Sequence, residues 1–225
     1  MATSYKPTIG EGIFSLRDVA DILQLPYYKV HRWINRYWDG QLGAEHGVTY
    51  SWRVDDVQAV NFHTLVELYL ALMIRGAGVR PRKIIEAHHQ LSLIYNSEFP
   101  FAQRQILDGI RTDGKSIFFE LPSGEVITLD GTNQLNLQFV KAFFHKLEFG
   151  EDDLATKFYP LGKERSIVVD PARKFGHPVL TNRNIYPETL YSLHLAGEPV
   201  DFIAHLYELS STQVNDALEY CKRAA

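Results

Sequence analysis

The chain has 225 residues and a single cysteine, Cys221. One cysteine excludes an intramolecular disulfide and argues against a cysteine-based zinc site. A long hydrophobic run is also absent, because the most apolar segment, residues 65–74, is too short to span a bilayer and contains Glu67. The N-terminal segment lacks the basic start and apolar core of a signal peptide. We therefore expect a cytoplasmic protein without a membrane segment.

An excess of positive charge is missing as well. The chain has 23 Lys and Arg against 27 Asp and Glu, a net charge of −4. Proteins that coat nucleic acid without sequence preference are strongly basic. The balance excludes that class, so binding to nucleic acid would have to come from a local patch and a specific site.

Signatures of catalysis are lacking too. The sequence contains no phosphate loop, nucleophile elbow, HExxH motif or Cys/His pair at metal spacing. His88 and His89 are adjacent and would point to different faces of a helix, and the acidic run 151–153 has the composition of a hairpin turn. We expect no catalytic residue, no metal site and no cofactor.

What the sequence does contain is a helix-turn-helix pattern over residues 15–36. Ser15 and Asp18 form a capping box at the start of the first helix. Apolar residues then recur with helical spacing on both sides of a break at residues 24–26. They are Leu16, Val19, Ala20, Ile22 and Leu23 in the first helix, and Val30, Trp33, Ile34 and Tyr37 in the second.

The second helix carries a polar face without an acidic residue. Such a face can enter a DNA major groove; the alternative is an ordinary helical hairpin with a solvated charged face. Gly40, Gly43 and Gly47 indicate a flexible connection. Residues 48–54 then predict two short strands of a wing, with Arg53 near its tip or on its return strand. The wing would reach phosphates or the minor groove, or would only pack. The predicted DNA-binding residues are Tyr27, Tyr28, Lys29, His31, Arg32, Arg36 and Arg53.

A second basic cluster follows further along the chain. Residues 64–67 read as a capping box that starts a buried helix, and Pro81 fits the first position of the next helix, which runs to about Tyr95. Four cations surround the junction, and they could contact phosphates or lie in a solvated turn. They are Arg75, Arg80, Arg82 and Lys83.

The middle of the chain predicts two hairpins around a helix. The hairpins comprise residues 116–129 and 146–159, and the helix comprises residues 136–145. The segment holds more aromatic side chains than a small module can easily bury, so part of this surface is expected to meet a partner.

The last third begins with a basic linker and then repeats the opening organisation. Pro187 starts a first helix, a second begins near Pro199, and Ser210 caps a third. The third helix is expected to expose Ser211, Thr212, Gln213, Asn215 and Asp216, and it has no basic residue before Lys222. Phosphate attraction dominates DNA affinity, so dimerisation or partner binding is favoured for this unit over groove reading.

Residues 168–217 resemble a bacterial and archaeal family of predicted antitoxins that is catalogued as a domain of unknown function. The front half resembles the MerR-like winged helix-turn-helix that precedes that tail in longer, VapB-type antitoxins. The similar segments in the tail are residues 169–171, 175–179, 188–190, 195–198, 203–204, 207–210, 213–214 and 217–218. Those in the front and middle are residues 62–68, 114–121 and 134–149. One departure occurs where the family shows Gly-Thr-Arg, because this chain has Asn182, Arg183 and Asn184 there.

The resemblance implies an antitoxin of a type II toxin–antitoxin system. Such a protein neutralises a PIN-type ribonuclease, whose site is a carboxylate cluster around a divalent cation. It also binds operator DNA as a homodimer and represses its own operon. An antitoxin could block the toxin's acidic site with an inserted cation or by covering the substrate path. The cations that could enter it are Lys163, Arg165, Arg173, Lys174 and Arg183. The competing hypothesis is a MerR-like one-component transcription regulator that senses a small ligand and has no toxin partner.

The predicted fold class is mainly α with small β-hairpins, an α+β protein. Residues 1–98 would form the MerR-like winged helix-turn-helix with its following helices. Residues 99–162 would form a connecting module of hairpin, helix and hairpin, and residues 163–225 a tri-helical, helix-turn-helix-like antitoxin domain.

Overall fold

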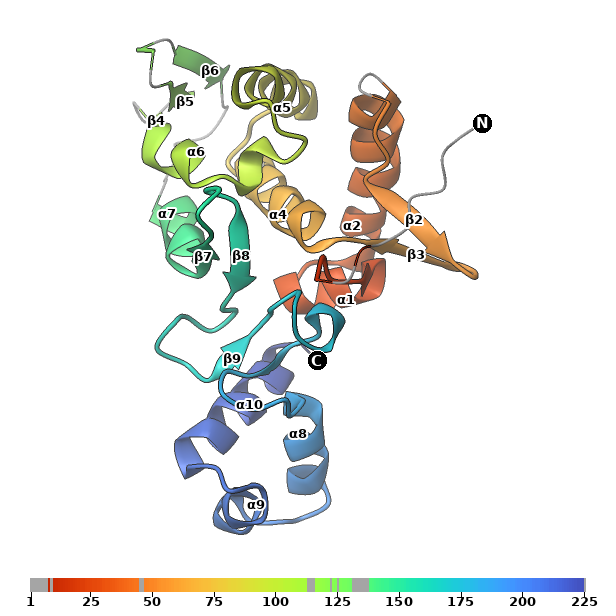
Figure 1. Ribbon diagram of the computed structural model, residues 1–225, viewed down its shortest axis with the longest axis vertical. Coiled ribbons are helices and arrows are strands. Elements are labelled where there is room, and N and C mark those ends of the chain that lie inside the picture. The colour runs from red at the N-terminus through yellow and green to blue at the C-terminus, as the bar shows by residue number, and fades with distance from the viewer. Residues whose placement is uncertain are drawn as a thin grey trace.

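The structure is a computed structural model that describes residues 8, 10–44, 47–112, 116–121, 123–124, 126–130 and 138–224. It is mainly helical with small antiparallel sheets, which confirms the predicted α+β class. Figure 1 shows the helices α8, α9 and α10 as a lobe at one end of the molecule, below the packed front and middle elements. None of the helices in the described part is long and apolar enough to cross a membrane.

The predicted helix-turn-helix is confirmed. It consists of α1 (Leu16–Leu23) and α2 (Tyr27–Trp33). The hydroxyl of Ser15 accepts from the Asp18 amide at 3.0 Å, and the Asp18 carboxylate accepts from the Ser15 amide at 2.8 Å, so the capping box is complete. Gln24 ends α1 in the left-handed region (φ 55°), and this residue turns the chain into α2.

The connection after α2 begins as a helix, so the prediction of a flexible connection was wrong at Gly40 and Gly43. The π-helix η1 (Ile34–Gly43) continues α2 and buries Trp38 and Leu42. A Cβ atom on Gly40 would lie 2.7 Å from the Asn35 carbonyl oxygen. The glycine is required there by close backbone approach within the wide π turn, not by freedom to move.

A three-stranded antiparallel sheet forms the wing. Its order is β1 (Phe14–Ser15), β3 (Val57–Val60) and β2 (Ser51–Val54). The prediction confined both wing strands to residues 48–54 and was wrong in extent. The chain reverses at Asp55 (φ 52°), so the second strand comes from the following residues.

Two long helices form the centre of the front half. They are α4 (Phe62–Gly76) and α5 (Pro81–Tyr95). Pro81 begins α5 as predicted, but the predicted capping box at Thr64 was wrong. Asn61 is the cap, and its side-chain oxygen accepts from the Thr64 amide at 2.8 Å.

A buried polar pair joins these two helices. The Glu67 and His88 side chains are fully buried, and His88 Nε2 donates to Glu67 Oε2. The other carboxylate oxygen of Glu67 accepts from the Phe101 amide at 2.7 Å, at the 3₁₀ turn η2 (Pro100–Ala102). His88 and His89 do face different directions, since His89 is only half-buried.

The middle segment contains both predicted hairpins, with two additional elements. The helix α6 and the strand β4, which adds a third strand beside β5, were not expected. The first two residues of the predicted helix 136–145 lie outside the described residues. The elements are α6 (Arg104–Gly109), β4 (Ile110–Thr112), β5 (Ser116–Glu120), β6 (Val126–Asp130), α7 (Gln138–His145), β7 (Leu147–Phe149) and β8 (Ala155–Phe158).

The expectation that middle-segment aromatics are left for a partner is not supported by their burial. Phe119, Phe143 and Phe158 are at most 4% exposed. The ring of Phe143 lies 4.3 Å from that of Tyr69 on α4. The module therefore buries its aromatics against the front half, and one hydrophobic core extends from Phe14 to Val169.

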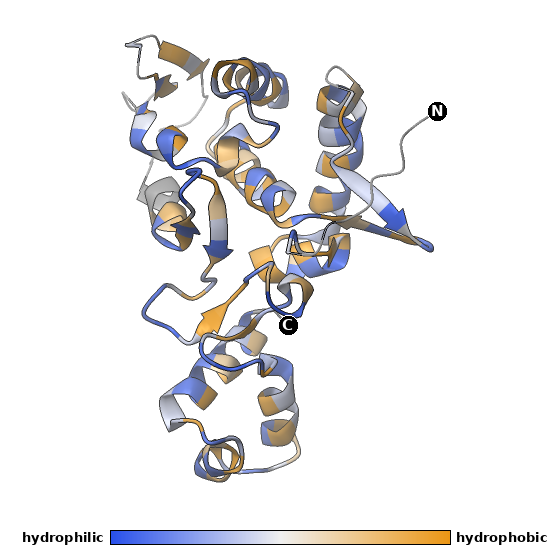
Figure 2. Cartoon of the chain, in the orientation of Figure 1, coloured by the Kyte–Doolittle hydropathy of each residue, from blue (hydrophilic) through white to orange (hydrophobic). Residues whose placement is uncertain are grey.

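The tail has its own hydrophobic core between Ile167 and Cys221. Its three predicted helices are confirmed as α8 (Pro187–Leu195), α9 (Val200–Tyr207) and α10 (Ser211–Ala224). The predicted linker is structured, because β9 (Ile167–Val168), orange in Figure 2, pairs with β10 (Val179–Leu180). The 3₁₀ turn η3 (Lys174–Gly176) lies between these strands.

Candidate nucleic-acid interface

The face of α2 that the sequence singled out is exposed. The opposite face of the helix is buried in the core, where the centroid of the Trp33 ring lies 4.8 Å from that of the Tyr37 ring. The helix therefore cannot turn without exposing this aromatic contact to water. Exposed on the opposite side are Tyr27, Tyr28, Lys29, His31, Arg32, Asn35 and Arg36.

The cations of this face are not neutralised within the described part of the chain. Lys29, Arg32 and Arg36 take part in none of its ion pairs. The Arg36 guanidinium lies over the Tyr37 ring, 5.6 Å from its centroid. Exposed cations without a carboxylate partner remain available to an external anion.

The wing is fixed to this helix by side-chain amides. Asn35 Nδ2 donates to Gln58 Oε1 at 3.2 Å, and Gln58 Nε2 donates to Asn35 Oδ1 at 3.1 Å. Gln58 Nε2 also donates to the Ser51 hydroxyl at 2.7 Å. Arg53 is exposed near the tip, where one of its guanidinium nitrogens donates to the Asp56 carbonyl at 3.3 Å. Helix and wing thus have a defined relative position.

Asp39 completes this connection from inside η1. Its carboxylate accepts from the amides of Tyr50 and Ser51 at 3.0 and 3.1 Å and from the Ser51 hydroxyl at 2.5 Å. Burial raises the pKa of Asp39, and these hydrogen bonds only partly oppose the effect. The carboxylate therefore pins the start of β2 to the helix that follows α2.

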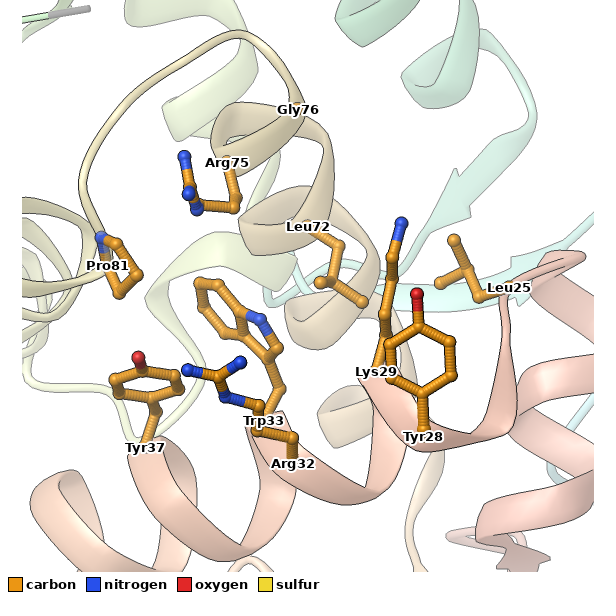
Figure 3. A pocket seen from close by; sticks show the side chains of 10 residues that line it. All are labelled: Leu25, Tyr28, Lys29, Arg32, Trp33, Tyr37, Leu72, Arg75, Gly76 and Pro81. Atoms are coloured by element: carbon orange, nitrogen blue, oxygen red, sulfur yellow. The ribbon is translucent and has the colours of Figure 1, made fainter.

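A pocket of about 520 Å³ separates α2 from the end of α4 and the start of α5 (Figure 3). Its wall includes Arg75 from α4 and Pro81 from α5, opposite the α2 side chains. The two basic clusters that the sequence placed 40 and more positions apart therefore meet at one surface. None of the described residues that line it has a carboxylate; they are Leu25, Tyr28, Lys29, Arg32, Trp33, Tyr37, Leu72, Arg75, Gly76 and Pro81.

A second hollow of about 700 Å³ adjoins the first and shares Tyr37 and Pro81 with it. Arg36, Arg80 and Arg82 line it, together with the carboxylate of Glu86. Glu86 accepts from Arg82 at 2.9 Å and lies 3.0 Å from the Lys83 ammonium, and these cations lower its pKa. The predicted cluster is thus divided: Arg82 and Lys83 are paired, whereas Arg75 and Arg80 face the side of α2.

The predicted partner-binding cations mostly have contacts inside the tail. Arg165 pairs with the buried Asp216 at 2.8 Å and with Glu219. Arg173 donates to the carbonyls of residues 180, 181 and 183 and to the Asn184 side chain, so it organises residues 180–184. Lys174 lies over the Tyr186 ring, and Arg183 is 3.7 Å from Glu208. Lys163 is exposed and forms no ion pair among the described residues.

Asp216 is 2% exposed, so its predicted exposure was wrong. Its carboxylate accepts from the Ser166 amide at 2.8 Å as well as pairing with Arg165. The cause is the hairpin that replaces the expected linker and lies against α10. The described residues include no cluster of three His, Cys, Asp or Glu side chains arranged to hold a metal ion.

Sequence reasoning missed Gln58 and Asp39, the residues that set the position of the wing. A polar residue in an otherwise apolar strand and an acid inside an apolar helix face were the available signals. Neither signal identifies the partner of Asp39 or the Asn35 partner of Gln58, because these contacts connect residues 11 to 23 positions apart.

Comparison with known proteins gives three likenesses. Residues 167–221, from β9 through α10, match the family described as a protein of unknown function, DUF433. The chain is 27% identical to the uncharacterized protein Rv2308 of Mycobacterium tuberculosis over 224 residues, covering 94% of this chain and 90% of that protein. A crystal structure of Rv2018 from Mycobacterium tuberculosis has the same overall fold, with a TM-score of 0.65 at 16% identity, over 96% of this chain and 99% of that one.

Proposed function

We propose that this protein is the antitoxin of a type II toxin–antitoxin system, which binds operator DNA and represses its own operon. The observation that carries the DNA-binding part is the exposed face of α2. Three cations there have no carboxylate partner among the described residues, and the wing is hydrogen-bonded to Asn35 of η1, which continues α2. The chain is acidic overall, so this local arrangement, not net charge, would attract the DNA backbone.

The proposed contacts follow from the position of each residue. Arg32 and the neighbouring side chains of α2 would reach base edges in the major groove, while Arg53 of the wing would contact phosphates or the minor groove. Arg75 and Arg80 would bind the phosphates that flank the groove. In a homodimer, two copies of α2 would enter successive major grooves about 34 Å apart.

The antitoxin part rests on the order of the units and on the resemblance of the sequence to VapB-type antitoxins. A front half with the proposed DNA-binding face precedes a tail whose three helices have a hydrophobic core of their own. Such a division allows one end to bind the operator while the other binds a PIN-type ribonuclease. Arg165, Arg173 and Arg183 have contacts that stabilise the tail. Lys163 is exposed and forms no ion pair among the described residues, so it is the cation most available to the toxin's acidic site.

The test is co-expression with the product of the neighbouring gene, combined with binding to the DNA upstream of the operon. We expect that product to arrest growth alone, and growth to be restored when this chain is present and co-purifies with it. Upstream DNA should bind more tightly than unrelated DNA of the same length. A non-toxic neighbour, or a toxic one that this chain neither binds nor neutralises, would contradict the antitoxin assignment.

The second candidate is a MerR-like one-component transcription regulator without a toxin. The pocket beside α2 favours it, because three aromatic rings and three cations line a space of about 520 Å³ that could hold a small anionic ligand. Tight binding to the upstream DNA, together with a harmless neighbouring product, would select this alternative.

A further inference from the structure

The outer side of α9 is apolar and has no partner within the described chain. Phe202 and Leu206 are one helical turn apart and are 49% and 55% exposed. Asp201 and His205 are exposed beside them, and we call these four residues the α9 face. Leu195, at the end of the preceding helix, is 68% exposed. Figure 1 shows α9 at the end of the tail that is farthest from the front half.

The stretch of the tail that carries this face is acidic, although the whole tail, residues 163–225, is close to neutral with eight Asp and Glu against seven Lys and Arg. Residues 184–221 contain six Asp and Glu and no Lys or Arg. Arg165, from outside that stretch, neutralises Asp216 and Glu219, and Arg183 lies near Glu208. Glu188, Glu198 and Asp201 have no cation within 4.0 Å among the described residues, so negative charge remains on α8 and α9.

The helix-turn-helix formed by α1 and α2 has the same turn geometry, but its exposed face is cationic. Glu208 ends α9 with φ 54° and ψ 46°, as Gln24 ends α1 with φ 55° and ψ 45°. In both turns the next amide donates at 2.8 Å to the carbonyl four residues before the turn, at Ala204 and Ala20. The tail is thus a second helix-turn-helix, but the negative charge of residues 184–221 would repel phosphates.

We propose that the α9 face is the docking surface for a partner protein whose contact surface has an apolar centre and a basic rim. This inference rests on the antitoxin part of the proposed function. A ribonuclease toxin must attract the phosphate backbone of RNA, so its substrate path carries positive charge. The α9 face matches that path in charge, and it would inhibit the toxin by excluding RNA rather than by inserting a cation into the metal site.

A second copy of this chain is the other possible occupant, through its cationic α2 surface. That contact would join two different surfaces of identical chains. Heterologous contacts of this kind extend into rings or open filaments unless the rotation closes. It would also cover the side chains that are proposed to bind DNA. The observations therefore favour a different protein.

The test compares two double variants for binding to the neighbouring gene product. In F202S/L206S the exposed apolar residues of the α9 face are removed, and in L93S/I94S two residues of α5 with similar exposure, 66% and 48%, are removed as the matched control. We expect F202S/L206S to weaken toxin binding at least tenfold and to lose growth rescue, while the control behaves as the wild type. Both variants should keep the wild-type circular dichroism spectrum and bind operator DNA normally, because the residues changed are exposed.

A charge variant and an RNA competition complete the test. E198K should weaken toxin binding further in the F202S/L206S background, and a short single-stranded RNA should compete with the wild-type chain for a catalytically inactive toxin. Normal toxin binding by F202S/L206S would overturn the inference and leave the proposed function standing. Absence of binding by the wild type would overturn both. Concentration-dependent assembly of the wild-type chain alone, lost in F202S/L206S, would overturn it in favour of self-association.

Discussion

Asn35 on η1 and Gln58 on β3 exchange two amide hydrogen bonds, of 3.2 and 3.1 Å, across 23 positions of sequence. This pair holds the wing at a fixed distance from the exposed face of α2. Both side chains are near the surface, so their hydrogen bonds contribute little to global stability. Their effect is to preorganise the two elements that we propose to contact DNA.

We predict that breaking this pair weakens operator binding without unfolding the protein. Asn35→Ala and Gln58→Ala should each reduce affinity by about three- to tenfold, because a lost hydrogen bond costs about 0.5–1.5 kcal/mol. The measurement is a double-mutant cycle of operator affinity. The double variant should bind about as well as either single variant. Additive losses would mean that each residue contacts DNA by itself.

The buried pair of Glu67 and His88 should be important for stability. Glu67→Ala leaves His88 and the Phe101 amide without their acceptor in a dry core, so we expect a loss of about 3–5 kcal/mol in the free energy of unfolding. Urea denaturation measures it. Glu67→Gln keeps one acceptor oxygen and should cost less. Glu86→Ala is the surface control, and we expect it to change stability by under about 1 kcal/mol. An equal effect of Glu67→Ala and Glu86→Ala would contradict this role.

Stability should decrease in mild acid because of His63. This residue on α4 donates from Nε2 to the Ala155 carbonyl at 3.0 Å, and burial lowers its pKa from the usual 6.5. Below pH 6.5, His63 takes up a proton more readily in the unfolded chain than in the folded chain. The free energy of unfolding therefore falls as the pH drops from 6.5 toward the lowered pKa.

The check is the pH dependence of urea unfolding between about pH 5.5 and 7.5. His63→Gln retains a donor for the Ala155 carbonyl but cannot take up a proton, so its slope over this range should be flatter than that of the wild type. If the two slopes coincide, His63 is not responsible for the dependence.

The helices were largely predictable from the sequence, because their signals are local. Ser15 and Asp18 cap α1, Pro81 begins α5, and apolar residues recur at helical spacing in both helix-turn-helix units. The errors occurred where the decisive partner is distant. From the sequence, Gly40 indicates a loop. Only the structure shows that a side chain at this position would meet the Asn35 carbonyl oxygen in a π turn.

The candidate site was partly predictable for the same reason. The cations of α2 follow from one helical pattern, whereas their meeting with Arg75 at the shared pocket depends on how α4 packs. Arg165 shows the opposite case, since it resembled a free cation in a linker. Its ion pair with Asp216 connects residues 51 positions apart, which no local pattern indicates.

Binding of operator DNA by the α2 face should appear in the salt dependence of operator affinity. Operator affinity should be measured as a function of salt for K29A/R32A/R36A and for R17A/K163A/K222A, which removes three exposed cations elsewhere. We predict that the first variant loses at least ~100-fold in affinity and lowers the salt slope by about 2–3, while the control stays close to the wild type. Unchanged affinity and an unchanged salt slope in K29A/R32A/R36A would show that the α2 face does not bind the operator.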